Sequence, residues 1–390
     1  MIRILTEDDV PAVVALFARV YPEHRWRSQA TGEAYFREML FDNPWRDLEL
    51  PSWVAEENGY IAGFQTVMPR PMMFRGRRLR VAVSTQFMVD PDKCNSLTAL
   101  QLTKAFISGP QDLTLVDGAN DQARQMWIGL GWPAPLLYNL HWTRPLRPAR
   151  YVLSLLQERA ALPPPLAFVT RPLSALADSL AARLRPNQFL REECDLVENT
   201  LDPAVMLAHL PDIMAGIALQ PVYDARTLAW LLDQTARKKR HGTLRARAVR
   251  DGERRLIGWY LYYILKGGVS EVVQIAARNG SFDCVLRRLL VDAWRQGAAA
   301  LRGRLEPRFV RELSDRHCWF RREGSWTLVH SRHADVLAAI QQGDAFLSRL
   351  EGEWWLRFLG EGETTRRVHH AGLGTVRPAR SASSRARTQG

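Results

Sequence analysis

Long hydrophobic runs are missing from this sequence. The longest apolar stretches are only as long as a strand, as in Trp259–Leu265, whereas a helix that spans a bilayer needs about 20 apolar residues. The first residues lack the pattern of a secretory signal, because Glu7 and Asp8 follow a short apolar stretch. We therefore expect a protein without a membrane span and with a cytoplasmic location.

Cysteine is scarce, and neither cysteine nor histidine shows the spacing of metal ligands. The sequence has four cysteines and nine histidines. Metal sites typically need closely spaced pairs such as Cys-x-x-Cys. The cysteines instead lie far apart, at Cys94, Cys194, Cys284 and Cys318. We expect ordinary reduced thiols and no metal site.

Acidic residues are outnumbered by basic ones, which gives a formal net charge of +12. One source is residues 361–390, which hold six arginines and two glutamates among Gly, Ala, Ser, Thr and Pro. Such a segment cannot bury enough apolar surface to become ordered. A second source is Arg237–Arg255, with nine basic and two acidic residues. The sequence has no helix-turn-helix, zinc-finger or RNP pattern, so a basic face that attracts the phosphates of a cofactor is favoured over nucleic-acid binding.

The chain is long enough for two domains, and its first part predicts a β-α-α-β-β-β-α-β-α-β unit. Apolar residues with helical spacing follow a near capping box formed by Thr6 and Asp9. Asn58-Gly59 between two apolar runs predicts a hairpin, because both residues accept a positive φ. Three later segments matter most for the site: a strand at Leu79–Val89, a helix at Ser96–Ile107 and a strand at Leu113–Val116. The unit is expected to close with a strand at Leu136–Trp142.

The same order of elements recurs in the second half. There the hairpin turn Asp251-Gly252 precedes an apolar pair, a glycine and an aromatic residue, as the turn Asn58-Gly59 does in the first half. A repeated order without close identity indicates an internal duplication. The proline-rich residues between the copies predict a linker. The expected division is a domain at 1–142, a linker at 143–168, a domain at 169–359 and a disordered basic tail at 360–390.

This order of elements resembles that of the GNAT superfamily, the acyl-CoA-dependent acyltransferases. The resemblance covers about residues 1–142 and, more weakly, 192–330. Its most specific part is the superfamily pattern Asn-x-x-Ala-x-x-x-Tyr-x-x-x-Gly-Phe, which is matched at Asn120, Ala123, Trp127, Gly131 and Trp132. The resemblance implies an α/β fold with two GNAT-like domains in tandem. Each would be a mostly antiparallel twisted sheet flanked by helices.

The resemblance also implies where acyl-CoA would bind. In the superfamily, a glycine-rich loop lets amides at a helix N-terminus approach the pyrophosphate. Here Asn95 and Leu97 replace two of the glycines. Asn tolerates a left-handed backbone, whereas the side chain of Leu97 would occupy space that the phosphates need, and Lys93 could supply a compensating charge. The implied acyl-CoA residues are Met88, Val89, Lys93, Asn95, Ser96, Leu97, Thr98, Ala99 and Asn120.

The implied catalytic residues depart from the superfamily. Trp127 stands where a general-acid tyrosine is frequent, and an indole has no proton to give at neutral pH. Asp117, after the strand Leu113–Val116, is the nearest ionisable candidate for catalysis. The alternative is an aspartate that hydrogen-bonds its own turn before Gly118. In the second copy, Asn279-Gly280 fits a turn better than a phosphate loop.

Two functions follow. The favoured one is an acyltransferase that moves an acetyl or other acyl group from acyl-CoA to an amine or hydroxyl of a small-molecule or sugar acceptor, without a metal. The other is a non-catalytic GNAT-fold binding or accessory protein, for example in a polysaccharide or metabolite modification pathway. The missing glycines and tyrosine favour the second function, whereas Pro91, Ala99 and Asn120 favour the first.

Overall fold

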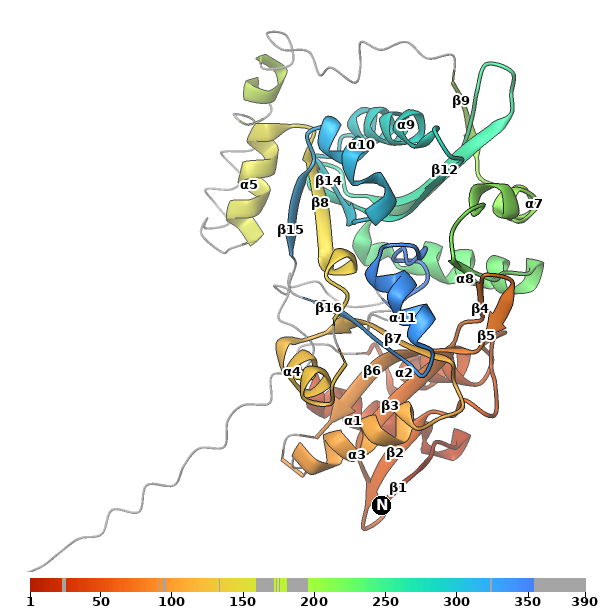
Figure 1. Ribbon diagram of the computed structural model, residues 1–390. Coiled ribbons are helices and arrows are strands. Elements are labelled where there is room, and N and C mark those ends of the chain that lie inside the picture. Colours follow the sequence, from red (N-terminus) through yellow and green to blue (C-terminus); the bar gives the residue numbers. More distant parts are fainter. Residues whose placement is uncertain are drawn as a thin grey trace, which may run out of the picture.

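The computed structural model (Figure 1) describes residues 1–22, 26–90, 92–93, 96–132, 134–158, 172, 174, 176–180, 196–322 and 325–353. Several predictions lie outside these residues: those on Asn95, on residues 159–168 of the linker and on the tail 360–390. The described chain forms mixed α/β units built on two large sheets, which confirms the predicted fold class. No helix among the described residues is both long and apolar enough to cross a bilayer.

The N-terminal half contains, in chain order, β1 (Ile2–Ile4), α1 (Val10–Val20), α2 (Gln29–Leu40), β2 (Trp53–Glu57), β3 (Tyr60–Pro69), β4 (Met72–Phe74), β5 (Arg77–Leu79), β6 (Val81–Val89), α3 (Ser96–Ile107), β7 (Leu113–Ala119), α4 (Asp121–Gly129), β8 (Leu140–Pro145) and α5 (Pro148–Glu158). The predicted turn between β2 and β3 is present, with φ values of 51° at Asn58 and 76° at Gly59. The predicted capping contact is also present, since the amide of Thr6 donates to the carboxylate of Asp9 (2.8 Å).

The C-terminal half contains β9 (Val197–Thr200), α7 (Pro203–Ile213), β10 (Leu219–Pro221), α8 (Ala225–Arg237), β11 (Thr243–Arg250), β12 (Leu256–Ile264), β13 (Val269–Ala277), α9 (Phe282–Arg295), β14 (Ala300–Arg304), α10 (Val310–Asp315), β15 (Trp319–Arg322), β16 (Trp326–Ser331) and α11 (Ala334–Gln341). One large sheet has the strand order β1-β2-β3-β6-β7-β16 and the other the order β15-β8-β14-β13-β12-β11-β9. Each large sheet is antiparallel except for one parallel pair, β6 with β7 and β13 with β14.

The two halves exchange one strand each. We expected a strand at Leu136–Trp142 to close the N-terminal sheet, and this expectation was wrong. The observed strand β8 instead pairs with β14 and β15 in the C-terminal sheet, where it stands out in yellow beside these two blue strands (Figure 1). In return, β16 pairs with β7 at the edge of the N-terminal sheet. The predicted boundary at residue 142 therefore falls inside a strand of the other half's sheet.

A single hydrophobic core also joins the halves. It packs α1, α2 and the N-terminal sheet against α7, α8 and one face of the C-terminal sheet. Strand β10 adds a further link, because it pairs with β4 of the N-terminal half in a small three-stranded sheet. A second core lies on the other face of the C-terminal sheet, beneath α9 and α10. Because so much apolar surface is shared, the halves should unfold together.

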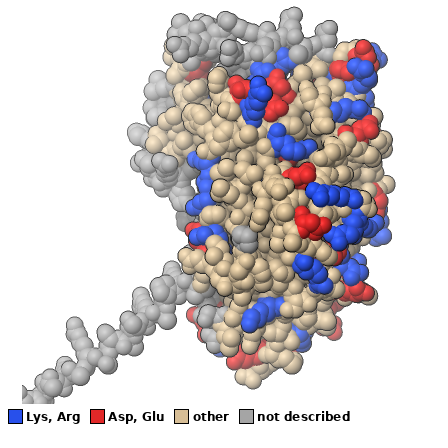
Figure 2. All heavy atoms as spheres, viewed as in Figure 1, with Lys and Arg blue, Asp and Glu red and all other residues tan. Residues whose placement is uncertain are grey.

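The surface charge is mixed on the visible face. In Figure 2, Lys and Arg side chains lie among Asp and Glu side chains instead of forming one uniform basic area. Ion pairs explain part of this pattern, as between Arg237 and Asp233 or between Arg255 and Asp251. The basic segment Arg237–Arg255 is thus partly neutralised by neighbouring acids.

Candidate functional site

Two neighbouring parallel strands of the N-terminal sheet, β6 and β7, diverge and form a V. Strands β6 and β7 pair in parallel only between Val81–Val83 and Leu113–Leu115. Beyond these residues their facing edges carry no ladder hydrogen bonds to each other within the described strands. Backbone amides and carbonyls on the open edges of a V are available to hydrogen-bond a ligand.

A bulge in β6 lies on the open side of this V. The register against β3 shifts between the pairs Thr66–Thr85 and Phe64–Met88. Gln86 lies inside the shift and has a φ of 49°, which is rare for a residue with a side chain. Its side-chain amide donates to the hydroxyl of Tyr35 (2.6 Å), which holds it in place. A bulge of this kind changes the direction of the backbone groups that follow it.

The predicted acyl-CoA residues lie along β6 and the start of α3. Met88 is buried, while Val89 is half-buried and pairs with Gly63. Lys93 and Leu97 are exposed, and the Lys93 ammonium lies 5.9 Å from the centre of the Tyr60 ring. Thr98 and Ala99 are half-buried on α3, which begins at Ser96.

Asn120 has a local structural role. It is the N-cap of α4, and its side-chain oxygen accepts the amide of Ala123 (2.7 Å). A cap of this type satisfies one of the free amides of the first helical turn. The match to the superfamily pattern at this position therefore fixes where α4 begins, immediately after β7.

The chain leaves β6 through a buried aspartate. Asp90 accepts the Tyr60 hydroxyl (2.6 Å) and the Arg19 guanidinium (3.0 Å). Burial would raise the pKa of Asp90, but these contacts and the amide of Asp92 outweigh it and hold the pKa below its usual value. The charged carboxylate therefore anchors the start of the segment that carries Lys93.

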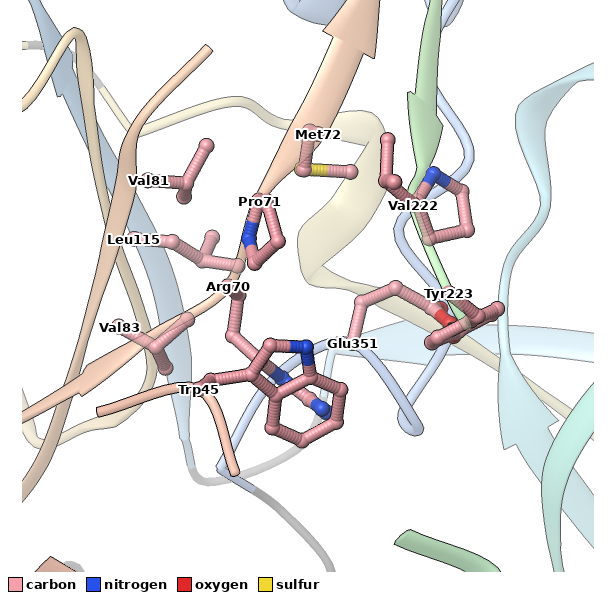
Figure 3. A pocket seen from close by; sticks show the side chains of 11 residues that line it. Trp45, Arg70, Pro71, Met72, Val81, Val83, Leu115, Val222, Tyr223 and Glu351 are labelled. Atoms are coloured by element: carbon pink, nitrogen blue, oxygen red, sulfur yellow. The ribbon is translucent and has the colours of Figure 1, made fainter. Parts of the chain in front are cut away.

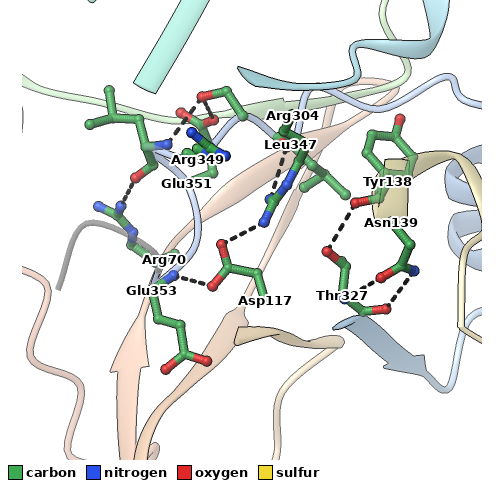
Figure 4. A network of polar contacts seen from close by, with 12 residues as sticks. Arg70, Asp117, Tyr138, Asn139, Arg304, Thr327, Leu347, Arg349, Glu351 and Glu353 are labelled. Carbon is green, nitrogen blue, oxygen red and sulfur yellow. Dashed lines mark hydrogen bonds and ion pairs between the residues drawn. The ribbon is translucent and has the colours of Figure 1, made fainter. Parts of the chain in front are cut away.

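Asp117 lies inside β7, not in a turn, so the expectation that β7 ends at Val116 was wrong. Its carboxylate forms an ion pair with Arg304 of β14 (2.9 Å) and accepts the amide of Glu353 (2.6 Å), as Figure 4 shows. Asp117 is 1% exposed and Arg304 is 8% exposed. The residue that we proposed as catalytic thus binds the two halves together, and Gly352 is packed so closely against it that a side chain would not fit.

The equivalent V of the C-terminal half is filled by the chain itself. Strands β13 and β14 pair in parallel only over Val269–Glu271 and Ala300–Arg302. Arg349, which is 1% exposed, donates to the carboxylate of Glu271 (2.6 Å) and to the carbonyl of Val272 (3.2 Å). Burial would raise the pKa of Glu271, but Arg302 and Arg349 outweigh it and hold the pKa well below its usual value. This V therefore contains a guanidinium held by a charged carboxylate.

The N-terminus of α9, which follows this second V, is also covered. Phe282, at the start of α9, stacks on Phe309 with ring centres 3.7 Å apart. Asp283 forms a two-point ion pair with Arg316 (2.6 and 2.5 Å). Asn279-Gly280 forms a turn, with a φ of 77° at Gly280. A carboxylate in the first helical turn and a covering aromatic pair both disfavour a phosphate there.

A small cavity lies at the closed end of the first V (Figure 3). Val83 and Leu115, from the last paired residues of β6 and β7, form one side of it. Three of its residues have ionisable side chains, namely Arg70, Tyr223 and Glu351. Its free space suits about one water molecule. The rest of the lining is Trp45, Pro71, Met72, Val81, Pro221 and Val222.

Glu351 is the carboxyl group of this cavity, and sequence reasoning missed it. It is 4% exposed and accepts hydrogen bonds from the Tyr223 hydroxyl, the Ser348 hydroxyl and the Gln274 amide (3.0 Å). Burial raises the pKa of Glu351 above its usual value, and it raises the pKa of Tyr223 well above its own. Arg70 stacks over the ring of Trp45 (4.2 Å) and donates to the carbonyl of Leu350. A buried carboxyl bonded to a phenol is an arrangement that can move a proton.

Comparison with solved structures identifies the fold. One match is a probable N-acyltransferase from Enterococcus faecalis V583, with a TM-score of 0.54 and 9% identity over 85% of this chain and 72% of the other. A GCN5-related N-acetyltransferase from Anabaena variabilis gives the same four values. The chain has the GNAT fold. This fold was predicted from the order of elements, and the prediction is confirmed. No family model matches the sequence, and neither does any curated protein.

With the GNAT fold assigned, a further buried carboxyl outside the cavity gives a testable prediction. Glu306 follows β14, and burial raises its pKa to about 7 from the usual 4.5 despite an ion pair with Arg308 (3.0 Å). Since its pKa is raised on folding, the unfolded chain loses this proton first. The free energy of unfolding should therefore fall by about 3 kcal/mol as the pH rises from 4.5 to 7, at about 1.4 kcal/mol per pKa unit.

The test is urea unfolding of wild type and Glu306→Gln across this pH range. The variant should lose less stability than wild type as the pH rises, because its amide does not titrate. Glu312→Gln, a change to a less buried residue on α10, is the matched control and should follow wild type. Parallel curves for wild type and Glu306→Gln would show that Glu306 titrates normally.

Proposed function

We propose that the N-terminal half binds acyl-CoA in the V between β6 and β7 and that the chain transfers the acyl group to an amine or hydroxyl in the cytoplasm. The observation that carries this proposal is the asymmetry between the halves. The V of β13 and β14 holds Arg349 and Glu271, whereas the V of β6 and β7 ends at a cavity that holds a carboxyl and a phenol. One acyl-CoA per chain is therefore expected.

In this proposal, the thioester lies near the bulge at Gln86 and the pyrophosphate lies near Lys93 and the N-terminus of α3. Free amides at a helix N-terminus and a nearby ammonium both stabilise phosphate groups. Leu97 is exposed, so its side chain can turn away from a ligand at the surface. Loss of one charge-assisted contact to a phosphate is expected to change the affinity for acyl-CoA by about tenfold.

The acceptor group enters the cavity beside Glu351. Because the free space is small, only a single amine or hydroxyl group of a larger acceptor fits there. Glu351 takes the proton of the attacking group as the new bond forms to the thioester carbon. Tyr223, whose hydroxyl is hydrogen-bonded to Glu351, gives its proton to the departing sulfur as the carbon–sulfur bond breaks and takes back the proton that Glu351 received. Holding the reacting groups together contributes much of the rate.

A non-catalytic binding protein is the second candidate, and one observation favours it. Leu97 stands in the first turn of α3, where the superfamily has a glycine, so the phosphate loop is incomplete. A non-catalytic protein would bind acyl-CoA without turning it over, or would not bind acyl-CoA at all. Isothermal titration of acetyl-CoA, followed by thiol release in the presence of a panel of amines and sugars, separates these outcomes.

Lys93→Glu tests the position of the pyrophosphate. The substitution should weaken acetyl-CoA binding at least about tenfold, because it replaces an attractive charge by a repulsive one. Titration calorimetry gives the Kd directly. Lys104→Glu is the matched control, since Lys104 is exposed at the other end of α3 and the change in net charge is the same. Equal Kd values for the two variants would show that the pyrophosphate does not bind near Lys93.

A further inference from the structure

We infer that the C-terminal half serves this site by orienting Glu351, with Trp259 of β12 and Gln274 of β13 as positioning residues for its carboxyl group. Neither side chain lines the cavity or belongs to the half that holds the V. The catalytic part of this inference rests on the proposed function. The contacts that orient Glu351 are observed directly among the described residues.

A chain of donors runs from the C-terminal sheet to the cavity. The indole nitrogen of Trp259 donates to the side-chain oxygen of Gln274 (2.8 Å). An indole nitrogen can only donate, so this contact fixes which end of the Gln274 amide is the oxygen. The nitrogen of Gln274 must then face the other way, where it lies 3.0 Å from Glu351 Oε1. The direction of the last hydrogen bond is thus set by the first.

Burial makes this orientation costly to lose. Trp259 is 0% exposed and Gln274 is 1% exposed. If the amide turned over, the indole would face an NH2 group and Glu351 would face a carbonyl, and two buried partners would be unsatisfied. The same amide nitrogen lies 3.3 Å from the hydroxyl of Ser348, which itself donates to Glu351 Oε2. Both oxygens of the carboxyl group are therefore held.

The neighbouring residue Arg349 holds the backbone of the same segment. Its guanidinium occupies the V of the C-terminal half and is bound by Glu271. A segment fixed at Arg349 can place Glu351, two residues later, in only a narrow range of positions. The segment that carries Arg349 and Glu351 therefore both fills the V of the C-terminal half and orients the Glu351 carboxyl.

In this inference, the C-terminal half has no acyl-CoA site of its own and instead holds the Glu351 carboxyl in place for the site in the N-terminal half. Equivalent positions illustrate the change. When the parallel pairs Val81–Leu113 and Val269–Ala300 are aligned, Gln86 corresponds to Gln274. Gln86 bonds Tyr35 beside its own V, whereas Gln274 bonds a carboxyl group that serves the V of the other half.

Loss of the Gln274 donor has a defined effect on protonation. A hydrogen bond to the charged carboxylate lowers the pKa of Glu351, so removing it should raise that pKa. Besides the Ser348 hydroxyl, the titratable and charged groups that face Glu351 are the Tyr223 hydroxyl, the Arg70 guanidinium and the Glu306 carboxyl. All three stay in place in a Gln274 variant, and the pKa of Tyr223, which the Gln274 contact lowers, rises as well, so the phenol stays neutral. The direction of the shift is therefore unambiguous.

The experiment is a Gln274→Leu variant, which keeps a similar volume and removes the donor. The acid limb of the kcat–pH profile should move up by about one pH unit, while KM for acetyl-CoA stays the same. Trp259→Phe, which leaves Gln274 in place but frees its amide to turn, should move the limb in the same direction by less. Gln111→Leu is the matched control, because Gln111 is also a buried glutamine and bonds only α3 and β7 in the N-terminal half.

A second measurement needs no activity. Carbon-13 NMR of labelled glutamate carboxyls, with Glu351→Gln to assign the resonance, gives the pKa of Glu351 in each variant. If that pKa and the acid limb are unchanged in folded Gln274→Leu and Trp259→Phe, the positioning role is overturned. Failure of the proposed function looks different, because wild type itself would then release no thiol from acetyl-CoA at any pH.

Discussion

Glu351→Gln is expected to lower kcat for acyl transfer by about a hundredfold or more while acetyl-CoA binding stays the same. General-base catalysis contributes roughly 10²–10⁴ in rate, and the amide cannot take a proton. The change keeps the shape of the side chain and its contact with Ser348. Steady-state kinetics and titration calorimetry on the same preparation measure both quantities.

The matched control is Glu198→Gln. Glu198 on β9 also accepts a tyrosine hydroxyl, from Tyr260 (2.6 Å), but it does not line the cavity. This variant should keep the kcat of wild type. A Glu351→Gln protein with wild-type kcat would exclude Glu351 as the base and leave the acceptor proton to another group.

The second large effect concerns stability. Asp117→Ala should lower the free energy of unfolding by about 3–5 kcal/mol, because it leaves Arg304 buried without its carboxylate. It also removes the acceptor of the Glu353 amide. Urea unfolding measures the loss. Asp315→Ala, which breaks the exposed Arg311–Asp315 pair, is the control and should cost less than about 1 kcal/mol.

Two further variants separate structure from catalysis at this position. Asp117→Leu combined with Arg304→Met should recover part of the stability, since an apolar pair of similar size removes both buried charges. Asp117→Asn should keep kcat per folded molecule. A large loss of kcat in folded Asp117→Asn would instead support the catalytic role that the sequence suggested for Asp117.

The sequence predicts the local structure well where a residue type has one dominant reason to be there. Asn58-Gly59 forms the predicted turn because both residues adopt a positive φ at little cost. Asn120 marks the start of α4 because its side chain caps the helix. Both signals involve partners within a few residues, so no tertiary information is needed.

Partners distant in the chain could not be predicted in this way. A strand was predicted at Leu136–Trp142, which overlaps β8, but a strand pattern does not show at which edge the strand pairs. No strand was predicted at β16. Asp117 fitted either a turn or a catalytic role, since its actual partner, Arg304, lies 187 residues away. Glu351 has no local motif at all, because its surroundings come from Tyr223 after β10, from β13 and from the segment at Ser348.

The exchange of β8 and β16 has a consequence for synthesis on the ribosome. β7 ends at Ala119 and its edge partner β16 begins at Trp326, so about 200 further residues must be made before that edge is covered. At roughly 5–20 residues per second, the interval is about 10–40 s. An uncovered strand edge can pair with another chain during that time. The nascent protein should therefore need a chaperone, or a slow and dilute supply of chains, until β16 emerges.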